Sequence, residues 1–210
     1  MQTHVSENQV EIQVTKELFP DCKDYLEVYE KTGLIGKRTL LAHGIYLTED
    51  ELNRLSAAGT TVVHCPDSNT GLVSGFFNAQ TTSESGVNIA LGTDVSGGSF
   101  AGMLDSMRMA ESVSKTIAIT QNTQNFHVNY RQSFLYATLN GAKSLGIDHI
   151  TGSLEVGKSF DAIIVDVAKA TESVFVEDDT PEELLERFIH IGDAQSIRRV
   201  FVAGKEVVTK

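Results

Sequence analysis

Three short apolar runs, each followed by a polar residue that could do chemistry, constrain the fold of this chain most strongly. The runs span 39–42, 60–63 and 87–91, and the polar residues near their ends are His43, His64 and Asp94. Runs of this length and composition are typical of buried strands, and helical patterns follow the first run, from Thr48, and the third run, around Met103–Met107. Strands that alternate with helices predict parallel βαβ units. The sequence therefore indicates an α/β protein whose polar side chains gather at the carboxyl ends of parallel strands, as in (β/α) barrels.

One connecting helix has clear start and stop signals. Thr48-Glu49-Asp50-Glu51 is typical of a capping box, in which the first and fourth side chains bind each other's backbone N–H groups. Leu52 and Leu55 follow at the spacing of an inner helical face, and Gly59 is a natural C-terminal stop.

The last third of the chain changes character. We expect one amphipathic helix over Arg131–Leu145, stopped by Gly146. Its apolar face would carry Phe134, Leu135, Leu139 and Ala142. Further on we expect a strand over Ala162–Val165, a short helix that begins at Thr180-Pro181, and a closing hairpin over Val200–Val208. This pattern predicts part of a small β domain beside the parallel sheet.

The charge balance and the hydropathy exclude several partners. The formal net charge of −11, from 17 Lys and Arg against 28 Asp and Glu, opposes non-specific binding to nucleic acid. No apolar run approaches the length that crosses a bilayer, and the first residues lack a signal peptide, so we expect no membrane association and a cytoplasmic location. Cys22 and Cys65 are expected to be reduced thiols, and the acidic run Glu177–Asp179 to be solvated surface.

Four motifs carry a resemblance to a known family. Their sequences are THVSEN at 3–8, LAHG at 41–44, HCPDSN at 64–69 and LGTD at 91–94. In this order and spacing they resemble the motifs of the amidohydrolase superfamily of metal-dependent hydrolases. Within it, Ser74–Asn78 and Asp94–Gly98 resemble the guanine deaminase family more than the cytosine deaminase or chlorohydrolase families. The resemblance covers essentially all 210 residues.

The resemblance implies a fold. Members of the superfamily are (β/α)8 TIM-type barrels, and the segment 152–166 resembles the part of their chains that returns to a small β-sandwich. We therefore expect residues 1–146 to form a partial barrel, made of its last strands and helices. We expect residues 147–210 to contribute part of the β-sandwich domain.

The resemblance also implies a site with one Zn²⁺ ion. His4 resembles the metal ligand on the fifth barrel strand, and Asp94 the ligand after the eighth. His43 resembles the sixth-strand histidine that hydrogen-bonds the substrate or the metal's water, and Glu7 resembles the proton shuttle. Glu7, His43 and Asp94 would thus be catalytic, and all four residues would contact the substrate.

The implied reaction is the deamination of guanine, a small purine base, to xanthine and ammonia. Zinc takes imidazole and carboxylate ligands and leaves a position for water, whose pKa it lowers to about 7. Hydroxide would attack the carbon that bears the exocyclic amine, while Glu7 moves a proton to the ring nitrogen and Asp94 could serve as a second base. Family members are commonly homodimers.

The sequence departs from the family pattern in one respect. None of its six histidines forms the His-x-His pair that supplies two metal ligands on the first barrel strand. We therefore expect a truncated chain with an incomplete ligand set. Two alternatives stay open: another aminohydrolase that acts on cytosine, adenosine-like or triazine substrates, and a non-catalytic fragment that only associates with homologous subunits.

Each site residue also has a simpler interpretation. A single histidine such as His4 is more often a surface or core residue than a ligand. Glu7 could be an acid at the start of a helix, and Asp94 could be a helix cap. His64 is expected to be structural, whereas Asn69, Phe76 and Phe77 either line a purine pocket or belong to the core.

Overall fold

The computed structural model describes residues 1–168 and 179–209. Its contacts divide the chain into two compact units, Met1–Gly146 and Ile147–Lys210, which we describe one at a time.

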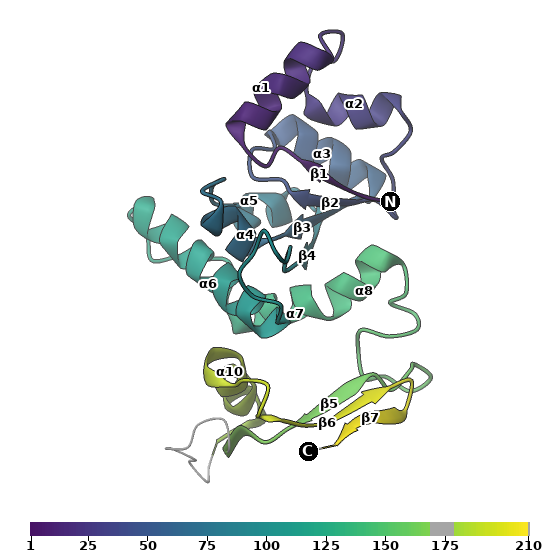
Figure 1. The fold of residues 1–210 in the computed structure, drawn as a ribbon, viewed down its shortest axis with the longest axis vertical. Helices are drawn as coiled ribbons and strands as arrows, with labels where there is room; N and C mark the ends of the chain where they lie inside the picture. The colour runs from purple at the N-terminus through teal and green to yellow at the C-terminus, as the bar shows by residue number, and fades with distance from the viewer. Residues whose placement is uncertain (169–178, 210) are drawn as a thin grey trace. The chain divides into compact units, whose positions relative to one another are not determined.

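The first unit is built on a parallel sheet (Figure 1). Its strands are β1 (Gln2–Val5), β2 (Leu40–His43), β3 (Thr61–His64) and β4 (Asn88–Leu91). They lie side by side in the order β1-β2-β3-β4, and every neighbouring pair is parallel. Because chain order equals spatial order, the sheet has the strand sequence of a barrel segment. The predicted α/β class is confirmed.

Helices connect and flank these strands. They are α1 (Gln9–Leu18), α2 (Tyr25–Lys31), α3 (Glu49–Ala58), α4 (Pro66–Gly71), α5 (Ala79–Glu84), α6 (Met103–Thr120), α7 (Tyr130–Ala137) and α8 (Leu139–Leu145). Across the sheet, one row of register partners consists of Leu41, Val62 and Ile89, all of which are fully buried. This row forms part of the core that holds the carboxyl ends of the strands in place.

Helix α3 begins and ends where the sequence predicts. Both halves of the capping box between Thr48 and Glu51 are present, and Gly59 ends the helix in the left-handed conformation at φ +68°. Leu52 and Leu55 are buried on its inner face.

The helix expected over Arg131–Leu145 is wrong as a single element. The structure has α7 and α8 instead, which meet at Thr138 with φ −120° and ψ −93°. The Thr138 hydroxyl donates a hydrogen bond to the Phe134 carbonyl oxygen, a local bond that competes with regular helix geometry. Phe134 and Leu135, expected on the apolar face, are exposed, and the buried residues of α7 are Tyr130, Ser133 and Tyr136. Gly146 ends α8 as expected, at φ +70°.

The second unit is an antiparallel sheet with a helix. Its strands β5 (Ala162–Val165), β6 (Ile197–Val202) and β7 (Lys205–Thr209) lie in that order, and α10 spans Pro181–Ile191. Ala203 and Gly204 connect β6 to β7 at φ +48° and +77°, as the tight turn of a hairpin requires.

The acidic run expected at the surface is only partly within the described residues. Residues 177 and 178 lie outside them. Asp179 forms an ion pair with Arg187 at 2.7 Å, and its side chain is only 11% exposed. The prediction of a solvated side chain is therefore wrong for Asp179.

Among the residues that the structure describes, none of the helices has the length and apolarity needed to span a bilayer.

The buried face of α3 gives a test of the fold. We expect Leu55→Ala to lower the free energy of unfolding by about 2–5 kcal/mol, because it removes a fully buried side chain and leaves a cavity. Leu72→Ala, at a position that is 58% exposed, is the matched control and should cost no more than about 0.5 kcal/mol. Urea denaturation of both variants measures the difference, and equal losses would contradict the assigned packing.

Candidate functional site at the carboxyl edge of the sheet

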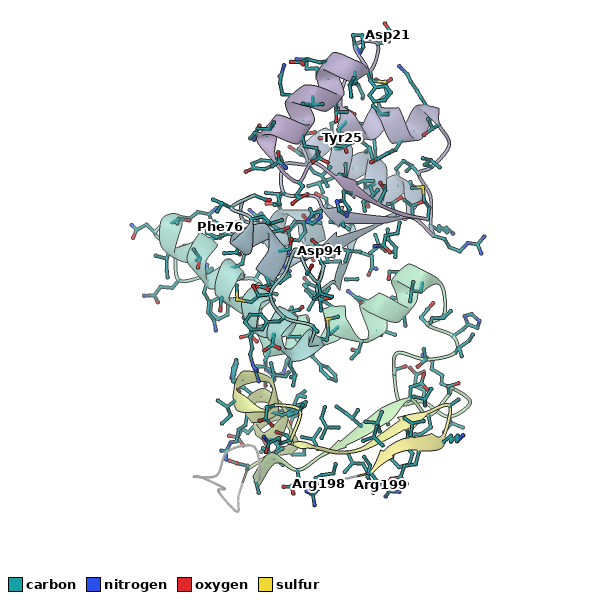
Figure 2. All side chains as sticks on the ribbon, in the orientation of Figure 1. Asp21, Tyr25, Phe76, Asp94, Arg198 and Arg199 are labelled. Atoms are coloured by element: carbon teal, nitrogen blue, oxygen red, sulfur yellow. The ribbon has the colours of Figure 1, made fainter. Side chains whose placement is uncertain are left out.

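Four chemically active side chains lie at the carboxyl edge of the parallel sheet. His4 belongs to β1, Glu7 follows β1, His43 is the last residue of β2, and Asp94 comes shortly after β4. Figure 2 labels Asp94 beside this edge. The structure therefore brings together all four residues that the sequence singles out, although they come from segments up to 90 residues apart.

His43 is at the centre of this cluster. Its side chain is fully buried, and its Nε2 lies 3.7 Å from Glu7 Oε2 and 3.9 Å from Asp94 Oδ2. The His4 ring meets the His43 ring edge to face, with 4.6 Å between their centroids. The His4 Nδ1 is 3.9 Å from Glu7 Oε2.

The donor set suits a metal ion. His4, His43 and Asp94 each offer one ligand atom, and these three atoms lie within 4.8 Å of one another. Imidazole nitrogen and carboxylate oxygen are both ordinary zinc ligands. The buried Nε2 of His43 has no hydrogen-bond partner among the described residues, which leaves its position available to a bound group. Side chains that can ligate a metal ion, those of His4, His43 and Asp94, therefore converge on one point.

The backbone at this edge is strained. Ser6, His43 and Asp94 have positive φ values of +47°, +71° and +49°, a region that side chains other than glycine rarely adopt. Each such residue costs about 1–3 kcal/mol and persists only where the surrounding structure enforces it. The strained residues lie at or shortly after the ends of β1, β2 and β4, in the same segments as the side chains of the cluster.

Two polar contacts support the cluster from behind. Asn69 Oδ1, on α4, lies 2.8 Å from His43 Nδ1, and both residues are buried. The Ser74 hydroxyl donates a hydrogen bond of 3.0 Å to Glu7 Oε1. The Asn69 carbonyl oxygen accepts the Ser74 backbone N–H at 2.8 Å, which links the two supports. Neither contact was predicted from the sequence, although HCPDSN and Ser74–Asn78 are among its motifs.

Asp94 is held by a tight loop. The Gly98 backbone N–H donates to the Asp94 carbonyl oxygen at 2.8 Å. Asp67 Oδ2 accepts the backbone N–H groups of Ser99 and Phe100, the latter at 3.2 Å. A Cβ atom at Gly98 would lie only 2.3 Å from the Thr93 carbonyl oxygen, so the loop needs glycine there.

His64 and Cys65 belong to the interior. Burial, followed by the electrostatic effect of the nearby His43, lowers the pKa of His64 to about 3, so the His64 imidazole is neutral at pH 7. The His64 ring packs against Phe77, whose side chain is also buried, with 4.7 Å between centroids. Burial, reinforced by Asp94, raises the pKa of the Cys65 thiol to about 12, which makes it a poor nucleophile.

The chain is similar to known enzymes over nearly its whole length. The sequence profile of the amidohydrolase family matches residues 1–207. The guanine deaminase of Mus musculus is 40% identical over 214 residues, which cover 99% of this chain and 47% of that protein.

Two solved structures show the same fold. The guanine deaminase of C. acetobutylicum, solved with guanine bound in its active site, matches with a TM-score of 0.90 and 34% identity over 99% of this chain and 48% of that one. An adenosine deaminase from Xanthomonas campestris, solved with bound zinc, matches with a TM-score of 0.84 and 30% identity over 99% and 45%. This chain spans about half the length of the curated relatives it matches. The expected fold class is confirmed, and the described strands form an open parallel sheet and a separate antiparallel sheet, without a closed barrel.

The close approach at Gly98 gives a first test of the site. We expect Gly98→Ala to destabilise the protein by at least about 1 kcal/mol, because the new methyl group would collide with the Thr93 backbone. The control is Gly36→Ala, where a Cβ meets no atom within 4 Å. Thermal denaturation compares the two variants, and a Gly98 variant as stable as the Gly36 variant would contradict the loop geometry.

The buried His64 gives a second test, based on pH. Its pKa is about 3 in the folded chain against an ordinary value of about 6.5, so the unfolded state binds the proton more tightly. Its contribution to stability is therefore complete above pH 6.5 and is lost as the pH falls toward 3. Between pH 7 and pH 5 we expect it to remove roughly 2 kcal/mol from the free energy of unfolding.

Two variants isolate this contribution. His64→Asn should lose that part of the pH dependence, whereas His149→Asn, at an exposed position, should keep it. Urea denaturation at several pH values measures both. If the free energy of unfolding of the His64 variant depends on pH as strongly as that of the unmodified chain, another group causes the effect.

Proposed function

Because the chain belongs to the amidohydrolase family, we propose that it provides catalytic residues of a zinc-dependent guanine deaminase, which hydrolyses guanine to xanthine and ammonia. The observation that carries this proposal is the convergence of His4, His43 and Asp94, with ligand atoms within 4.8 Å of one another and Glu7 beside them. The guanine deaminases among the relatives, at 40% identity in Mus musculus, favour guanine as the substrate.

In this proposal His4 and Asp94 hold the metal. His4 is about half exposed, so its ring can adjust its position, whereas Asp94 is fixed by the loop that ends at Gly98. When bound, zinc would supply Lewis-acid activation of a water molecule. The relative from Xanthomonas campestris was solved with bound zinc, which supports this choice of metal.

Glu7 would carry the protons. The Ser74 hydroxyl holds Glu7 Oε1, so that Oε2 faces His43 Nε2 at 3.7 Å and is free to exchange a proton. Glu7 would take a proton from the attacking water and deliver it to the purine ring nitrogen. The water oxygen forms a bond to the carbon that bears the exocyclic amine. The remaining proton of the water would then pass through Glu7 to the amine nitrogen, the bond from that carbon to this nitrogen breaks, and the nitrogen leaves as ammonia.

His43 and Asp94 would complete the arrangement around the substrate. His43 Nε2, which is buried and faces both carboxylates, would hydrogen-bond the water or the purine. Asp94 could act as a second base in addition to its ligand role. We also propose that the active enzyme is a homodimer, as is common in the family.

Substrate and metal assays test the proposal. We expect a version of the chain that also carries the His-x-His segment of the family pattern, supplied with Zn²⁺, to bind zinc and to convert guanine to xanthine, measured by ammonia release and chromatography. Adenine and cytosine serve as competing substrates. Ammonia from those bases alone would overturn the guanine assignment, and no turnover of any base would overturn a catalytic role of this chain in favour of a non-catalytic fragment.

The role of Glu7 can be tested separately. We expect Glu7→Gln to lower kcat by about 10²–10⁴-fold, because the amide cannot transfer the proton, and to leave the zinc content unchanged. Glu17→Gln, on the exposed face of α1, is the control and should leave both unchanged. Asp94→Asn should instead lower the zinc content. A Glu7 variant with full activity would remove Glu7 from the mechanism.

A further inference from the structure

We propose that Asn69 is a positioning residue that holds His43 with its proton on Nδ1 and leaves the lone pair of Nε2 at the point where His4, His43 and Asp94 converge. The contact behind this proposal is the 2.8 Å distance between Asn69 Oδ1 and His43 Nδ1. An amide oxygen can only accept a hydrogen bond, so the proton of this bond belongs to the imidazole. The effect on catalysis rests on the function proposed above, but the protonated nitrogen can be determined without it.

Burial makes this contact decisive for His43. His43 and Asn69 are 0% and 1% exposed, so water does not compete for Nδ1. A buried polar atom that loses its partner costs about 1–3 kcal/mol. Moving the proton to Nε2 would break the bond to Asn69, because His43 Nδ1 and Asn69 Oδ1 would then be two acceptors that face each other. The tautomer with the proton on Nδ1 is therefore favoured.

The other side of the ring offers no comparable bond. His43 Nε2 lies 3.7 Å from Glu7 Oε2 and 3.9 Å from Asp94 Oδ2, and both distances exceed those of protein hydrogen bonds. Within the described ranges Nε2 has no hydrogen-bond partner at all. Its lone pair therefore faces the point where His4, His43 and Asp94 converge.

Asn69 is itself fixed in place. It lies on α4, and its carbonyl oxygen accepts the backbone N–H groups of Ser74 and Gly75 at 2.8 and 3.3 Å. Its neighbour Asp67 binds the backbone of the loop that follows Asp94. The same short helix therefore supports His43, the Ser74 contact to Glu7, and the loop of Asp94. Asn69 acts through His43 and not on the substrate.

The nitrogen that carries the proton can be read directly by nuclear magnetic resonance. We expect ¹⁵N-labelled chain, free of metal and substrate in mildly alkaline buffer, to show a protonated Nδ1 and an unprotonated Nε2 at His43. Assignment of the His43 signals follows from their loss in His43→Gln. A proton on Nε2 in the unmodified chain would overturn the proposal.

Three variants separate positioning from a merely structural role. Asn69→Leu removes the acceptor and should shift the His43 signals toward the form protonated on Nε2, which free neutral histidine favours. Asn69→Asp keeps an oxygen at the same place and should restore the Nδ1–H form. Asn88→Leu is the matched control, because Asn88 bonds Thr61 and Asn140 at the opposite end of the sheet. It should destabilise the chain without moving the His43 signals.

The outcomes for structure and for function are distinguishable. If Asn69→Leu leaves the His43 signals unchanged, or if Asn88→Leu moves them equally, Asn69 is structural and the proposal fails. If Asn69→Leu does not fold, the His43 signals of the unmodified chain and of Asn69→Asp still show which nitrogen carries the proton. Where guanine turnover is measurable, Asn69→Leu should lower kcat about 10–100-fold, the range seen for outer partners of metal-site histidines, and Asn69→Asp should recover most of it. Absence of turnover would count against the proposed function and leave the assignment of the proton intact.

Discussion

The parallel pairing of β1 through β4 is the constraint on which the site depends. Parallel strands have their carboxyl ends at one edge of the sheet, so residues far apart in the chain meet at that edge. The register that pairs Val5 with His43 and His64 with Leu91 sets which residues reach that edge. A slip of one residue would turn His43 to the other face of the sheet.

On this frame, the site combines a buried imidazole with carboxylates that stay partly in contact with solvent. His43 is fully enclosed, whereas the Glu7 and Asp94 side chains are 16% and 30% exposed. An enclosed ring keeps its orientation, and the low local dielectric strengthens its few polar contacts. The partly exposed carboxylates remain able to exchange protons with water. This division of burial suits a site in which one group orients and another transfers protons.

The sequence predicted those parts of the fold that have local signals. The strand before His43 and the start of α3 at Thr48 follow from a short apolar run and a capping pattern, which need no knowledge of distant residues. The break at Thr138 was missed because the surrounding residues continue a helical pattern and the bond to the Phe134 carbonyl depends on the folded geometry. The partner of His43 is 26 residues away, so only the folded chain could show it.

The left-handed backbone at Ser6, His43 and Asp94 has a consequence for how such a chain can be altered. Three unfavourable conformations together withhold a few kcal/mol from a fold whose total stability is typically about 5–15 kcal/mol. Replacing these residues by glycine would relax the backbone, but it would also remove the imidazole of His43 and the carboxylate of Asp94. Selection for stability alone would therefore favour glycine at these three positions, so the strained backbone is a stability cost that goes with keeping these side chains at this edge of the sheet.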